Sequence, residues 1–142
     1  MIWVLDASVA VRWFLSDESH PHADSVLAQL VARPGRFAVP ELFAYEVFAV
    51  LQRLHPDALA VFRQAILPLL HNGLLRHPMT ESLAVMADAF VKIGLTGYDA
   101  CYAALAKDLK GCWLTFDAKA HRRLDQFHLS CDLSERLPPD WD

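Results

Sequence analysis

The chain has 142 residues, of which 54% are hydrophobic and 21% are charged, and its formal net charge at pH 7 is −4. This length supports one domain with a substantial core, and this composition excludes an intrinsically disordered chain. The negative charge argues against a protein that only coats nucleic acid electrostatically, because such a protein should be basic. Any contact with nucleic acid therefore needs locally placed basic residues and acids with a different role.

The cysteines and the first residues indicate where the protein works. Cys101, Cys112 and Cys131 are odd in number and form no C-x-x-C pair, so neither a disulfide framework nor a zinc knuckle is expected. A reducing, cytoplasmic setting follows as the expectation. The first apolar run meets Asp6 after only four residues, which is too short for a signal peptide. No stretch approaches the roughly 20 apolar residues of a membrane helix.

Short apolar runs without alternation recur along the chain, and such runs are typical of strands buried on both faces of a parallel sheet. The first run leads straight into Asp6, and another ends shortly before Asp117. The expected strands cover residues 2–5, 37–39, 74–77 and 112–115, with an edge strand over residues 129–133.

Apolar positions at helical spacing predict helices between these strands. Pro34-Gly35 and Gly94 are stop signals, and Pro68 is expected to kink or shorten the end of its helix. The expected helices cover residues 8–15, 21–32, 41–54, 58–71, 80–94, 96–109 and 119–124. Alternating strands and helices predict one α/β domain over residues 1–142, a three-layer α/β/α sandwich with a short parallel sheet and a tail from about residue 134.

Four acids fall where this connectivity brings the chain to one edge of the sheet. Asp6 and Asp117 follow strands, and Asp99 lies in the first turn of the helix that leads to the strand at 112–115. Glu46 lies six residues beyond Pro40, which is about 9 Å along a helix and within reach for a long side chain. Ligands collect at the carboxyl ends of strands in open α/β sheets, so we expect the four carboxylates to meet there.

Each acid taken alone also has a purely structural interpretation. Asp6 and Asp117 can cap helices, and the spacing of Thr96 and Asp99 fits a capping box. Glu46 is harder to explain in this way, because it lies in a mostly apolar helix where an unpaired carboxylate is costly. Clustered carboxylates raise one another's pKa values and call for a cation. Oxygen ligands without a His or Cys pattern favour Mg²⁺ or Mn²⁺, which supports phosphoryl chemistry.

Four segments, 4–9, 39–47, 95–102 and 114–117, carry these acids in a fixed order and spacing. Together they resemble the PIN-domain nucleases and are most similar to the VapC-type toxins of toxin–antitoxin pairs, over residues 1 to about 124. The resemblance implies an endoribonuclease dependent on Mg²⁺ or Mn²⁺ that hydrolyses RNA with a metal-activated water and leaves a 5′-phosphate. It also implies a homodimer and a cognate VapB-type antitoxin that blocks the site.

The resemblance assigns roles to named residues. It implies that Asp6, Glu46, Asp99 and Asp117 are the catalytic and metal-binding acids. Ser8 and Thr115 match the small hydroxyl residues that accompany the first and last acids, although ordinary capping would also explain them. Candidate RNA-phosphate contacts beyond the last acid are Lys119, Arg122 and Arg123, for which a solvated basic helix face is an equally good interpretation. Arg12, one turn after Ser8, is a candidate contact to a phosphate or to the antitoxin.

Two other functions stay open at this stage. A phosphatase with Asp6 as nucleophile usually needs a second acid two residues later, where this chain has Ser8. A non-catalytic PIN-like module that binds RNA or protein is disfavoured by the presence of all four acids. Ala49 leaves that alternative open, because many relatives carry Asn at this position, one turn after the second acid, and loss of its amide weakens metal or substrate positioning.

Overall fold

The computed structural model describes residues 1–141 and has a five-stranded, fully parallel sheet in the order β3-β2-β1-β4-β5. Every residue of the central strands β1 and β2 is buried, which explains why their sequences are apolar without alternation. The parallel sheet predicted from the sequence is thereby confirmed. The strands are β1 (Trp3–Leu5), β2 (Phe37–Pro40), β3 (Leu75–His77), β4 (Cys112–Thr115) and β5 (Ser130–Asp132).

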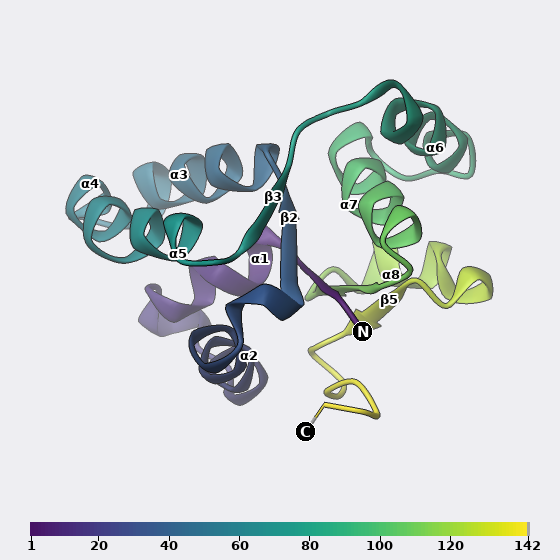
Figure 1. The fold of residues 1–142 in the computed structure, drawn as a ribbon. Coiled ribbons are helices and arrows are strands. Elements are labelled where there is room, and N and C mark those ends of the chain that lie inside the picture. The colour runs from purple at the N-terminus through teal and green to yellow at the C-terminus, as the bar shows by residue number, and fades with distance from the viewer. Residues whose placement is uncertain (142) are drawn as a thin grey trace.

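Helices lie on both sides of the strands, with α3, α4 and α5 grouped on one side and α6 and α7 on the other (Figure 1). Helix α6 packs on α7, and α7 packs on β1, β2 and β4, which completes the predicted layered α/β/α arrangement. Within residues 1–141, no helix has both the length and the apolar character needed to cross a membrane. The helices are α1 (Ala7–Ala10), α2 (Pro21–Ala32), α3 (Leu42–Leu54), α4 (Ala58–Val61), α5 (Leu67–His71), α6 (Glu81–Lys92), α7 (Gly97–Asp108) and α8 (Ala118–Arg123).

The single helix predicted over residues 8–15 is wrong in type and extent. Helix α1 ends at Ala10 and continues as a 3₁₀ turn over Val11–Trp13, which the Phe14 N–H closes by donating to the Val11 carbonyl at 3.1 Å. The Trp13 indole donates to the Ala23 carbonyl of α2 at 2.8 Å. Aromatic residues lose side-chain freedom in an α-helix, which disfavours a continuation of α1 through Trp13. The hydrogen bond from Trp13 to α2 stabilises the tighter 3₁₀ turn at this place.

The helix predicted over residues 58–71 is confirmed in extent, but its middle is not an α-helix. A π-helical turn, Phe62–Ile66, separates α4 from α5, and the Leu67 N–H donates to the Phe62 carbonyl five residues back. Pro68 has no N–H and its ring crowds the preceding turn. The wider turn accommodates the proline in the first turn of α5, where a missing donor is tolerated, rather than kinking the end of the helix as predicted.

The chain reverses its direction of winding between β1 and β4, because β2 and β3 lie on one side of β1 and β4 and β5 on the other. Such a topological switch point opens a crevice outside the carboxyl ends of the two strands. Leu5 pairs with Leu114, and the Asp6 N–H donates to the Leu114 carbonyl at 3.2 Å. The turn after β1 and the turn after β4 therefore meet in this crevice.

Residues 134–141, predicted as a tail, contain no helix or strand. They nonetheless pack on the sheet through Trp141, which is only 8% exposed. Its ring centroid lies 5.5 Å from that of Trp3 and 6.4 Å from that of Phe37. These contacts lie at the amino ends of β1 and β2, opposite the crevice.

Candidate active site

Asp6 is held in a fixed position by three donors. Its side chain is 8% exposed and accepts hydrogen bonds from the Trp113 indole and the Ser8 N–H, both at 3.1 Å, and from the Thr115 hydroxyl at 3.4 Å. Val4 pairs with Trp113 across the sheet. Since side chains alternate along a strand, Trp113 and Thr115 share a face with Asp6 and both point to its carboxylate.

The charge of Asp6 is only partly compensated by these donors. The pKa of the Asp6 carboxyl is raised from 3.8 to about 6, chiefly by burial, with a smaller upward contribution from the charges of Glu46 and Asp99, while hydrogen bonds with Ser8 act in the opposite direction. Loss of water around an acid disfavours its charged form, and neighbouring negative charges add to that effect. A bound cation at this position would relieve both penalties.

Glu46 is the second acid, and an aromatic residue holds it as well. Its Oε1 accepts a hydrogen bond of 2.8 Å from the Tyr102 hydroxyl of α7. Burial raises the pKa of Glu46, the Tyr102 hydrogen bond lowers it, and the charge of Asp99 raises it. The Tyr102 ring stacks on Trp113 with centroids 5.6 Å apart and an angle of 11°. Two aromatic side chains in contact therefore position Asp6 and Glu46.

Asp99 and Asp117 lie at helix starts. The Asp99 N–H donates to the Thr96 hydroxyl at 3.2 Å, and Asp117 Oδ1 accepts from the Ala120 N–H at 3.0 Å. Burial raises the pKa of Asp99, the charge of Asp117 raises it further, and hydrogen bonding with Thr96 lowers it. Thr96 therefore caps α7 and Asp117 caps α8, and the charge of Asp117 also acts on Asp99.

The two hydroxyl residues tie the turn after β1 to the turn after β4. Thr115 is fully buried, and its oxygen accepts from the Asp117 N–H at 3.0 Å while its hydroxyl donates to Asp6. Ser8 Oγ accepts from the Phe116 N–H at 3.2 Å. Both residues thus fix the relative positions of the first and last acids, in addition to any capping.

The donor set suits a hard divalent cation, because all four side chains are carboxylates and burial and mutual repulsion raise the pKa values of Asp6, Glu46 and Asp99. Within residues 1–141, no three His, Cys, Asp or Glu side chains lie close enough together to hold one ion in their present positions. Tyr102 holds Glu46, whereas Asp117 is exposed and its side chain has freedom to rotate. Asp6 has no such freedom, and it is the fixed member of the set.

The basic candidates separate into two groups. The Arg12 guanidinium lies 4.0 Å from the centre of the Phe116 ring and donates to the Glu18 carbonyl at 3.0 Å, and Arg123 donates to the Gly94 carbonyl at 2.8 Å. Lys119 and Arg122 are exposed on α8, and their side chains make no hydrogen bond or ion pair with the described part of the chain. Only these last two are free to meet an incoming ligand.

Sequence reasoning missed three residues at this edge: Trp113, Tyr102 and Asp132. Tyr102 ends the motif segment 95–102, but neither its role nor that of Trp113 in holding an acid is visible without the β1–β4 register and the docking of α7. Asp132 is 7% exposed and pairs with Thr115, but its Oδ1 accepts from the Ser134 hydroxyl at 2.6 Å and the Ser134 N–H at 3.0 Å. It closes the turn after β5, a role that the spacing of Asp132 and Ser134 would have indicated.

Comparisons with known proteins agree with this architecture. The chain is similar to PAE2754 from Pyrobaculum aerophilum (TM-score 0.67, 21% identity, 95% of this chain and 91% of that chain). It is also similar to a toxin–antitoxin complex from Klebsiella pneumoniae (TM-score 0.62, 17% identity, 83% and 88% of the two chains). A third similar structure is the sarcin-ricin loop cleaving toxin VapC20 of Mycobacterium tuberculosis (TM-score 0.59, 14% identity, 84% and 93%). These identities are low, and the likeness shows a shared fold.

No curated protein sequence matches the chain. A family model does match it: the PIN domain model covers residues 3–126, which include Asp6, Glu46, Asp99 and Asp117. With most of its length matched, this chain belongs to the PIN domain family.

Proposed function

We propose that this protein is an endoribonuclease dependent on Mg²⁺ or Mn²⁺ and the toxin of a type II toxin–antitoxin pair. The observation that carries the proposal is the set of four carboxylates, from four distant segments, that influence one another's ionisation at the switch point of the sheet. Membership of the PIN family supports nuclease chemistry, and the similarity to VapC20, a toxin that cleaves the sarcin-ricin loop, supports RNA as the substrate.

Asp6, Glu46, Asp99 and Asp117 would hold the cation. When bound there, Mg²⁺ or Mn²⁺ lowers the pKa of a coordinated water and neutralises negative charge on a phosphodiester. Asp6 supplies the fixed ligand, because Trp113, Ser8 and Thr115 hold both of its oxygens. Hydrolysis that leaves a 5′-phosphate is the outcome that the family resemblance implies.

The residue two places after Asp6 argues against a phosphatase that uses Asp6 as a nucleophile. Such an enzyme usually has a second acid at that position. Ser8 takes the place where a second acid would stand, and its oxygen accepts from the Phe116 N–H.

Lys119 and Arg122 are our assignment for the RNA-phosphate contacts. Both are exposed on α8, which begins directly after Asp117, so phosphates that flank the cleaved bond would pass close to them. Arg12 and Arg123 have weaker support in this role, because Phe116 and the Glu18 carbonyl engage Arg12 and the Gly94 carbonyl engages Arg123.

A VapB-type antitoxin and a homodimer complete the proposal. The similar structure from Klebsiella pneumoniae is a toxin–antitoxin complex, which supports a protein partner of this kind. Two aromatic side chains of α3, Tyr45 and Phe48, are 75% and 39% exposed and suit a protein interface. An RNA substrate and a protein antitoxin are both consistent with an activity in the cytoplasm.

A cleavage assay tests this proposal. Purified protein should cut structured RNA with Mg²⁺ or Mn²⁺, lose the activity with EDTA and regain it when the metal is restored, with 5′-phosphates on the products. Absence of cleavage with either metal, across ribosomal, transfer and single-stranded RNA, would favour the alternative of a non-catalytic binding module.

A further inference from the structure

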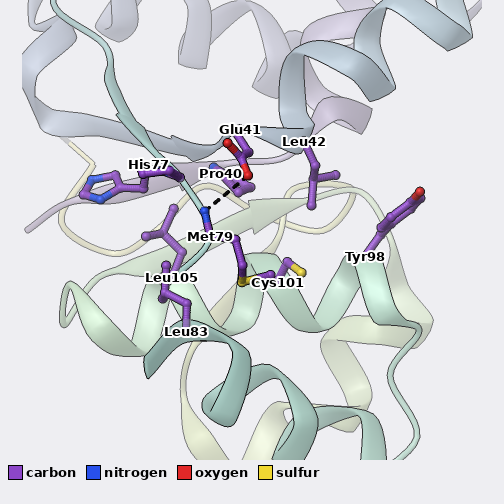
Figure 2. Close-up of a pocket in the computed structure, with 10 residues that line it drawn as sticks. Pro40, Glu41, Leu42, His77, Met79, Leu83, Tyr98, Cys101 and Leu105 are labelled. Carbon is purple, nitrogen blue, oxygen red and sulfur yellow. Dashed lines mark hydrogen bonds between the residues drawn. The ribbon is translucent and has the colours of Figure 1, made fainter. Parts of the chain in front are cut away.

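A cavity of ≈ 190 Å³ opens beside the acids, between the ends of β2 and β3 and the first turns of α3 and α7. Figure 2 shows Glu41 and Leu42 on one side of it, Met79 and Cys101 opposite them, and His77 and Tyr98 at its two ends. The ends of β2 and β3 and the start of α3 contribute residues at the carboxyl edge of the sheet, while Leu83 of α6 and Leu105 along α7 complete the lining. The cavity therefore lies on the side of the molecule where the substrate must bind.

Helices α3 and α7 contribute residues to both the cavity and the acid site. On α7, Tyr98 precedes Asp99 directly and Cys101 follows two residues later, and on α3, Leu42 lies one turn before Glu46. Burial raises the pKa of the Cys101 thiol, and the charge of Glu46 raises it further, as expected for neighbouring groups. A strand bound with one phosphate at the acids would therefore bring an adjacent nucleotide to the cavity.

The dimensions and walls of the cavity suit a single aromatic ring. A dry protein cavity of about 150 Å³ holds a benzene molecule, so ≈ 190 Å³ accommodates one six-membered ring and is small for a fused purine. Leucine and methionine side chains provide apolar walls. Tyr98 is 66% exposed at the rim and offers a ring face, and aromatic side chains of this kind stack with unpaired bases.

A carboxylate in the wall, Glu41, favours a ring that donates a hydrogen bond, and His77 and Tyr98 at the ends of the cavity can each donate or accept. Glu41 Oε1 accepts from the Met79 N–H at 3.3 Å, while Glu41 Oε2 receives no hydrogen bond from residues 1–141 (Figure 2). A carboxylate only accepts, so it complements the exocyclic amine of cytosine. The carbonyl oxygen that uracil presents at the same position would face another acceptor.

From this geometry we propose that the cavity binds one unstacked cytosine of the RNA strand, adjacent to the phosphodiester that is cut. This inference rests on the proposed function for its substrate class. A nucleobase is favoured over a protein side chain because the cavity adjoins the phosphate site, because its size fits one ring, and because Glu41 provides an acceptor at its wall.

Fluorescence anisotropy with short labelled oligomers of cytidine, uridine and adenosine tests the proposal, with Ca²⁺ in place of Mg²⁺. Wild type should bind oligocytidine most tightly. Glu41→Gln should reduce the preference for cytidine over uridine about tenfold, the typical contribution of a charged hydrogen bond. Met79→Trp should fill the cavity and weaken oligocytidine binding about tenfold or more, whereas the control Val85→Trp, on the exposed surface of α6, should not.

Equal affinity of wild type for the three oligomers would overturn the proposal, and so would unchanged oligocytidine binding by Met79→Trp. The second result would leave a protein partner as the occupant of the cavity. Wild-type thermal stability in both cavity variants excludes misfolding as the cause of weaker binding. Cytidine preference without RNA cleavage under any metal would count against the nuclease and not against the cavity, so the two proposals fail separately.

Discussion

The two halves of the acid site are held in different ways. Asp6 and Glu46 each accept a hydrogen bond from a large aromatic residue, and these two aromatic residues stack on each other. Asp99 and Asp117 lie at helix starts. Asp117 is exposed, whereas Asp6 is only 8% exposed. The first pair is preorganised and, in the proposed nuclease, would set where the cation binds, while the second pair would have the freedom to adjust to cation and substrate.

The largest effect should follow from removing the fixed ligand. Asp6→Asn should reduce RNA cleavage by more than about a hundredfold, beyond the usual cost of losing a residue that merely supports a metal ligand. The protein should stay folded, because Asn preserves the shape of the side chain. Asp88→Asn, at an exposed ion pair with Lys92 on α6, is the matched control and should keep full activity. Full activity in Asp6→Asn would remove this residue from the site.

The same variant should change how stability depends on pH. The folded-state pKa of Asp6 is raised from 3.8 to about 6, so the folded protein holds this proton more tightly than the unfolded chain does. The contribution of Asp6 to the free energy of unfolding should therefore be fully present below pH 3.8 and decrease by about 3 kcal/mol as the pH rises through about 6. Asp6→Asn should lack that part of the decrease in urea unfolding with EDTA present. Parallel pH profiles for the two proteins would contradict the burial of an ionised Asp6.

A smaller effect should follow from weakening the aromatic support. Trp113→Phe keeps an aromatic ring next to Tyr102 but removes the donor to Asp6, and it should lower cleavage about tenfold at fixed metal concentration. Excess Mn²⁺ should restore much of the activity, because the defect lies in ligand positioning. Tyr102→Phe removes the donor to Glu46 and should act in the same direction. If the dependence of cleavage on metal concentration is unchanged in both variants, Asp99 and Asp117 alone define the metal site.

The smallest effects should come from the basic residues. Lys119→Ala and Arg122→Ala should each weaken RNA binding a few-fold and reduce its salt dependence by about one unit of slope, as expected for one phosphate contact. Arg123→Ala should instead lower the thermal midpoint slightly, because it loses the hydrogen bond to the Gly94 carbonyl, and should leave the salt dependence unchanged. If Arg123→Ala reduced the salt dependence and Lys119→Ala and Arg122→Ala did not, Arg123 rather than Lys119 and Arg122 would contact the RNA phosphates.

The layered fold and the placement of the acids could be predicted because both follow from local patterns and connectivity. Buried parallel strands give apolar runs, and a right-handed crossover returns each helix start to the carboxyl edge, so Asp6, Asp99 and Asp117 could be placed at one edge of the sheet. The depth of Glu46 along its helix followed from the rise per residue.

The supporting contacts depend on information that no local pattern carries. The hydrogen bond from Trp113 to Asp6 requires the β1–β4 register, and the bond from Tyr102 to Glu46 requires the docking of α7 against α3. The π-helical turn before Pro68 likewise reflects how the chain accommodates a missing donor rather than a propensity of its residues. Tertiary packing decides these features, which is why the division of the site into two halves emerged only from the structure.

The most direct test of the account is a titration with Mn²⁺ that compares wild type with Asp6→Asn by thermal unfolding. A ligand that binds only the folded state stabilises it by about 2.7 kcal/mol at a hundredfold excess over its Kd, so the thermal midpoint of wild type should rise by several degrees. Asp6→Asn should show little or no rise at the same concentration. Equal shifts in the two proteins would contradict a cation site built on Asp6, and with it the proposed nuclease centre.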